Sequence, residues 1–84
     1  MTESERIKII DDRINEERRC LKANLKELKD SVNSMLEEFE ELDGYELHKK
    51  WYYPTHLHGM IIGRTSSIMD LDLVKHRILE QEEE

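Results

Sequence analysis

The residues best suited to chemistry lie between positions 45 and 64, where most aromatic and histidine side chains gather. His56 and His58 stand two apart, and in an extended segment both would point to one side, a spacing that some zinc sites use. His48 would be a third ligand across a β-hairpin. No second cysteine and no HExxH motif accompanies them, so surface or partner contacts explain these histidines better. We therefore predict no metal site and no cofactor.

Catalysis would need groups that the sequence does not bring together. We would expect a nucleophile beside a base, or two carboxylates held apart in a pocket. Instead, the acidic residues belong to charged helical segments, and the serines fall at expected capping positions. The chain has no glycine-rich phosphate loop, and an elongated protein of 84 residues has little room for a cavity. The sequence therefore predicts a protein that is not an enzyme.

Two cations are followed directly by three aromatic side chains in a short stretch around position 51. Such a mixture could pack a β-hairpin onto a helix, contact a partner protein, or stack the bases of single-stranded nucleic acid. Packing is the simplest of the three interpretations. If the stretch is instead a contact surface, the residues predicted to bind a partner are Lys49, Lys50, Trp51, Tyr52, Tyr53, His56 and His58.

An apolar residue stands at every seventh position from Ile7 to Leu42. A second row follows four residues later, charged at Asp11 and Arg18 and apolar from Leu25 onwards. This alternation of four and three predicts a coiled-coil helix, which needs a partner. The partner would be a second copy or another helical protein. The acidic segment from Glu37 to Asp43 favours an antiparallel homodimer, because it would then approach basic residues near Arg18. The predicted oligomer interface consists of Ile14, Leu21, Leu25, Leu28, Val32, Met35, Phe39 and Leu42.

Local signals predict a mainly α fold. Thr2 and Glu5 fit a capping box that starts a helix near Glu3, and Gly44 is expected to end it. Pro54 and two glycines then predict a short aromatic turn or β-hairpin, with a short helix from Tyr45 to Trp51 as the alternative. The expected organisation is a coiled-coil helix over 1–44, an aromatic and histidine-rich hairpin or turn over 45–66, and a short C-terminal helix with an acidic tail over 67–84. Thr65, Ser66 and Ser67 are expected to cap that last helix.

The net charge of -7 argues against nonspecific nucleic-acid binding through the whole surface, because phosphate contacts need a positive face. The N-terminus lacks an apolar signal region, and no apolar run approaches the ~18 residues of a membrane span. We therefore expect a soluble protein of the cytoplasm or nucleus, without membrane contact. A single cysteine, Cys20, excludes an internal disulfide.

These patterns favour a protein interaction module that oligomerises through its coiled coil and presents an aromatic patch to a partner, as an adaptor or regulatory subunit. Two alternatives remain open. The carboxylates of 37–43 and 80–84 could occupy a basic cleft, as an acidic inhibitor or nucleic-acid mimic would. A small RNA-binding regulator would use the stretch from Lys49 to Tyr53. Binding in both alternatives should weaken steeply with salt, whereas coiled-coil assembly should not.

Overall fold

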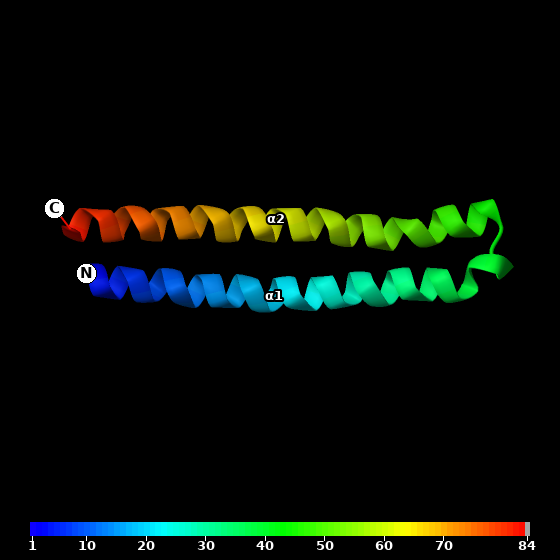
Figure 1. The fold of residues 1–84 in the computed structure, drawn as a ribbon, viewed down its shortest axis with the longest axis horizontal. Coiled ribbons are helices and arrows are strands. Elements are labelled where there is room, and N and C mark those ends of the chain that lie inside the picture. Colours follow the sequence, from blue (N-terminus) through cyan, green and yellow to red (C-terminus); the bar gives the residue numbers. More distant parts are fainter. Residues whose placement is uncertain (84) are drawn as a thin grey trace.

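The protein is an antiparallel hairpin of two long helices (Figure 1). The computed structural model describes residues 1–83, with side chains for 1–81. Helix α1 spans Glu3–Glu38, a short 3₁₀ turn η1 spans Phe39–Glu41, and helix α2 spans Gly44–Glu83. The chain reverses at η1, so the start of α1 and the end of α2 lie at the same end of a rod measuring 63 × 17 × 15 Å.

The predicted start of the first helix is confirmed. The hydroxyl oxygen of Thr2 accepts a 3.1 Å hydrogen bond from the backbone N–H of Glu5, and α1 begins at Glu3. This side-chain oxygen satisfies one of the backbone donors that every helix leaves free in its first turn. The start of α1 is therefore fixed by local chemistry that the sequence displays.

The role predicted for Gly44 is wrong, because this glycine begins α2 instead of ending α1. α1 ends earlier, at Glu38, and Leu42 adopts an extended backbone between the helices. Asp43 caps the second helix, since its carboxylate accepts a 2.8 Å hydrogen bond from the N–H of Glu46. A capping residue followed three positions later by glutamate is a helix-start signal, so the sequence did contain the information.

The predicted β-hairpin or short aromatic turn and the short C-terminal helix are also wrong. α2 runs without interruption through Pro54, Gly59 and Gly63. Interior glycine costs a helix about 1 kcal/mol and proline about 3 kcal/mol, but Pro54 is fully buried against α1, where packing offsets the local penalty. Thr65 lies inside the helix and does not cap it, because its hydroxyl donates to the carbonyl of Ile62 at 3.0 Å. Ser66 and Ser67 likewise lie within α2.

The row of every seventh residue on α1 does face a helix, and that helix is α2 of the same chain. Ile14 is buried, and the other members are half-buried. We call the residues of each helix that face the other helix its seam. On α1 a second row of seam residues lies three positions after the every-seventh row, for example at Glu17 and Asn24. The sequence predicted that the residues four positions after the first row would face the partner helix, but they lie beside the seam. Leu25 remains 48% exposed and Phe39 54% exposed. The inward row of α1 consists of Ile7, Ile14, Leu21, Leu28 and Met35, and Leu42 follows it in the connection between the helices.

The matching seam of α2 alternates in steps of three and four. Leu57, with 1% of its surface exposed, and Pro54 are its fully buried members. Such a pattern keeps one stripe of the helix against its partner over many turns. The stripe passes through the proline and the predicted turn without a break, which is why α2 is a single helix. Its members are Leu47, Lys50, Pro54, Leu57, Ile61, Arg64, Ile68, Leu71, Lys75 and Ile78.

Polar pairs cross this seam near both ends and in the middle. Lys75 contacts Asp11 at 2.6 Å near the termini, and Lys50 pairs with Glu38 near the turn. In the middle, Arg64 binds both Asn24 and Glu17. Each pair fixes which residues of α1 and α2 lie at the same height along the long axis of the rod. If one helix slid by one turn along the other, all of these contacts would therefore break. Among the described residues, no helix is both long and apolar enough to cross a membrane.

Candidate interaction surface

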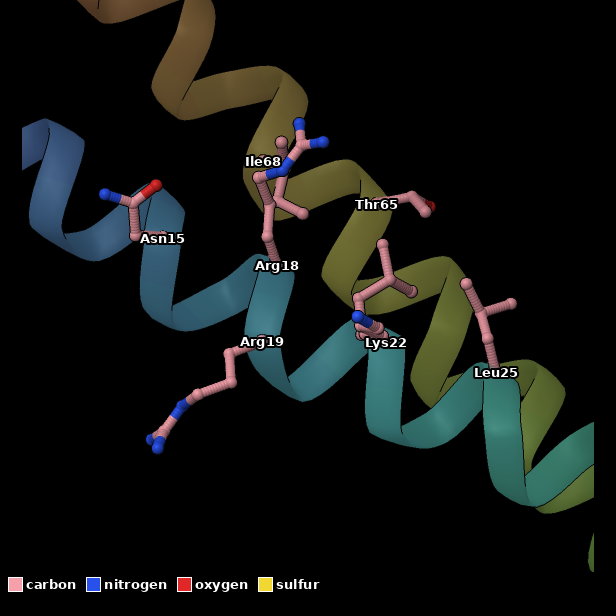
Figure 2. Close-up of a pocket in the computed structure, with 8 residues that line it drawn as sticks. Asn15, Arg18, Arg19, Lys22, Leu25, Thr65 and Ile68 are labelled. Atoms are coloured by element: carbon pink, nitrogen blue, oxygen red, sulfur yellow. The ribbon is translucent and has the colours of Figure 1, made fainter.

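Hollows open along one side of the hairpin. A groove of about 650 Å³ lies between Leu21 and Leu25 of α1 and Thr65 and Ile68 of α2 (Figure 2). A second hollow, of about 450 Å³, continues from Thr65 and Ile68 towards the C-terminal half of α2. A third, of about 300 Å³, lies near the turn beside Trp51. The first two hollows share Thr65 and Ile68, and the third lies further towards the turn on the same side of the hairpin.

We call this side the grooved face. Helical geometry places on it the flanking rows of both helices, next to the residues that line the hollows. Several large apolar side chains on it are uncovered, including Leu25, Leu36 at 67% exposure and Trp51 at 51%. The grooved face consists of Arg18, Lys22, Leu25, Lys29, Val32 and Leu36 of α1 and Phe39 of η1, with Trp51, His58, Ile62, Thr65, Met69 and Asp72 of α2.

The opposite side of the hairpin is more polar, and Ile9 is the one large apolar side chain that α1 contributes to it. Tyr53 lies there and donates a 2.7 Å hydrogen bond from its hydroxyl to the carboxylate of Glu27. This bond favours the neutral phenol and raises the pKa of Tyr53. We call this side the polar face. It consists of Ile9, Arg13, Cys20, Glu27 and Ser34 of α1, with Tyr53, Met60, Ser67 and Val74 of α2.

Basic residues line the α1 edge of the grooved face. Figure 2 shows Arg18 extended towards α2 beside Ile68, whereas Arg19 points away from α2. Arg19 binds Glu16 at 2.7 Å, and this hydrogen bond lowers the pKa of Glu16. Arg18 is exposed, and Asp72 lines the neighbouring hollow on the α2 side. The α1 edge of the grooved face therefore carries several positive charges, and the α2 edge carries one carboxylate, that of Asp72.

The structure separates the residues that the sequence grouped as a partner-binding patch. Because α2 is helical there, consecutive side chains point about 100° apart around its axis. Lys50 turns inward to Glu38, Tyr53 lies on the polar face, and Trp51 lies beside the third hollow on the grooved face. Lys49, Tyr52 and His56 are exposed, while His58 lines the same hollow as Trp51. This stretch is therefore contiguous in sequence and divided in space.

The histidines are not arranged as the extended segment would have placed them. His56 and His58 diverge because residues two apart on a helix face different directions. His48 packs edge-on against Tyr52, with ring centroids 5.1 Å apart and a 3.2 Å contact between Nε2 and the phenol oxygen. Within residues 1–81, no group of three or more histidine, cysteine or acidic side chains is placed to hold a metal ion.

Sequence reasoning missed part of the grooved face. Leu36, Ile62 and Met69 did not appear in either predicted set, although all three are exposed apolar residues there. The apolar pattern of α2 continues through Pro54 in steps of three and four, and it could have been followed in the sequence. Ile62 and Met69 each come one position after a member of that pattern, so this signal would have placed them at its side. Leu25, Val32 and Phe39 were predicted for an interface, and the hairpin leaves Leu25 and Phe39 exposed on this face.

The fold and this surface define a class of protein, an antiparallel helical hairpin with one apolar, grooved side. No protein-family model matches the chain, and no curated protein or solved structure matches it either.

Proposed function

We propose that this chain is a non-enzymatic protein interaction module whose grooved face packs against helices of another molecule, either a second copy or a helical partner. The observation that carries the proposal is the difference between the two sides of the hairpin. Leu25, Leu36 and Trp51 are about half-exposed or more on the grooved face, whereas on the polar face α1 presents charged and small residues with the single large apolar exception of Ile9. Contiguous exposed apolar surface of this kind is typical of protein interfaces.

The composition of the grooved face also suits a protein partner. Trp51 stands half-exposed beside an apolar hollow lined by Leu28 and Pro54. Tryptophan and arginine are the residue types that most often dominate the energy of a protein interface, and Arg18 lines the groove further along. A small module of this kind would serve as an adaptor or a regulatory subunit.

The two other functions considered from the sequence draw less support. A base-stacking platform needs Lys49 to Tyr53 on one surface, and α2 distributes these residues around its circumference. An acidic mimic would rely on the carboxylates around the turn, and one of them, Glu38, is paired with Lys50. We therefore place the interaction surface on the grooved face.

A photo-crosslinking amino acid tests this proposal directly. Introduced at Leu25, in the groove, it should form covalent adducts with a second protein molecule in the purified protein or in cells that express the chain. The matched control is the same amino acid at Ser34, which lies on the polar face of the same helix. Adducts from position 25 and none from position 34 are the expected result. Equal adducts from both positions, or none from position 25 in either setting, would overturn the proposal.

A further inference from the structure

We infer that the molecule covering the grooved face is a second copy of this chain. The two copies dock with their grooved faces together and with both turns at the same end. In this arrangement α1 of each copy lies over α2 of the other. This inference rests on the proposed function and names the partner for the same surface. The assembly is a four-helix bundle with its twofold axis parallel to the helices.

The surface area of the isolated hairpin fits a subunit of a dimer. The chain exposes 6763 Å², whereas a compact monomer of 10.1 kDa exposes about 5300 Å². The excess of roughly 1500 Å² falls within the range of about 1000–2500 Å² that each subunit buries in an obligate homodimer. Only a partner as long as the rod can cover the hollows along its length, and a second copy has that length.

The heights of the exposed apolar residues match in this arrangement. The contacts Asn24–Arg64 and Glu38–Lys50 show which residues of α1 and α2 share a height along the rod. A twofold axis parallel to the helices preserves these heights between copies. By this correspondence Leu25 lies across from Ile62 of the second copy, and Leu36 lies across from Trp51 of the second copy. Exposed apolar residues on α1 therefore meet exposed apolar residues on α2, and each contact occurs twice.

Charge selects the same arrangement. Arg18 lies within one helix turn of the height of Asp72, so this arginine of α1 faces the Asp72 carboxylate of the second copy. If the turns lay at opposite ends, α1 would instead run antiparallel over its own copy, as the sequence suggested. The middle of α1 would then meet itself, and Lys22 would approach Lys22 of the second copy with Arg18 and Lys29 close by. Like charges at these positions disfavour that pairing.

The first experiment measures mass. Sedimentation equilibrium of the wild-type chain should give twice 10.1 kDa. Leu25→Glu places a carboxylate in the groove of each copy and should raise the dissociation constant about 100-fold or more. Ser34→Glu, on the polar face of the same helix, should leave the mass unchanged. A wild-type monomer at every concentration would overturn the inference, and so would a dimer that Ser34→Glu disrupts while Leu25→Glu leaves it intact.

The second experiment measures orientation. Asp43→Cys in a Cys20→Ser background places one spin label at each turn, and pulsed electron resonance then gives the distance between the labels of two copies. Turns at the same end should give a distance within about 30 Å, because neighbouring helices pack 8–10 Å apart. Turns at opposite ends would place the labels about the length of the rod apart, 63 Å. The longer distance would overturn the inference.

The outcomes separate this inference from the proposed function. A monomer whose photo-crosslinker at position 25 captures a different protein would end the second-copy inference and leave the interaction module standing. A monomer that forms no adduct from position 25 would end both. A dimer of the expected mass with the short label distance supports both at once.

Discussion

Arg64 of α2 donates a 2.9 Å hydrogen bond from Nε to the side-chain oxygen of Asn24 on α1, a partner forty residues earlier in the chain. Asn24 is buried, with 7% of its surface exposed, and Arg64 also reaches Glu17 at 3.2 Å. This polar layer is the middle one of the three places where polar pairs cross between the helices. Sliding α2 by one turn would leave the asparagine and the arginine without these partners, so the layer fixes which residues share a height.

Arg64→Ala should lower the free energy of unfolding by about 1–3 kcal/mol, because it leaves the buried Asn24 and the partly buried Glu17 without their partner. Urea denaturation at a fixed protein concentration measures this change. The control Arg77→Ala removes an arginine from an exposed position of the same helix and should change stability by less than about 0.5 kcal/mol. Equal effects of the two substitutions would show that the layer contributes nothing.

Leu57→Ala should be far more damaging, with a cost of about 2–5 kcal/mol, because it opens a cavity in the most deeply buried part of the seam. A chain of this size has little stability beyond that amount, so we expect loss of helix content in circular dichroism at room temperature. Ile9→Ala, at an exposed position of α1, should leave the helix content intact. If Leu57→Ala melts like the wild type, then α2 is not packed on α1 through this residue.

Trp51→Ala distinguishes a contact residue from a core residue. The indole is half-exposed in the hairpin, so its removal should leave helix content nearly unchanged and should weaken association between chains by about 2 kcal/mol or more. Sedimentation equilibrium and circular dichroism on the same samples give both quantities. Tyr52→Ala, next along the helix and turned away from the hollow, should affect neither. A large loss of helix content with unchanged association would assign Trp51 to the core.

The hydrogen bond from Tyr53 to Glu27 predicts a stability change at alkaline pH. The bond raises the pKa of Tyr53 in the folded state, so its contribution is fully present below the ordinary tyrosine pKa of about 10 and is lost as pH rises through the raised value. In a Tyr45→Phe, Tyr52→Phe background, ultraviolet titration of the remaining tyrosine should show that Glu27→Gln lowers its pKa. An unchanged titration midpoint would mean that the bond does not form in solution.

The sequence by itself determined the local features of α1. A hydroxyl at Thr2 and an unbroken helical pattern fix where this helix starts, and the row from Ile7 to Leu42 marks the stripe that must be covered. These features depend on neighbouring residues and on helical periodicity, both of which can be recognised in the chain. The break near position 43 was also visible, although the glycine there begins a helix instead of ending one.

Tertiary structure decided the course of α2 and the position of the surface. Local propensity at Pro54 and the following glycines opposes a helix, and burial against α1 outweighs it. The contact between Arg64 and Asn24 sets how the two helices align. In this alignment α2 covers the row of α1 that contains Asn24, and it leaves Leu25 and Phe39 exposed on the grooved face. The aromatic stretch divides among several faces for the same reason, since neighbours in sequence are not neighbours around a helix. Which apolar residues remain exposed depends on contacts forty residues apart, and no local pattern in the chain specifies those contacts.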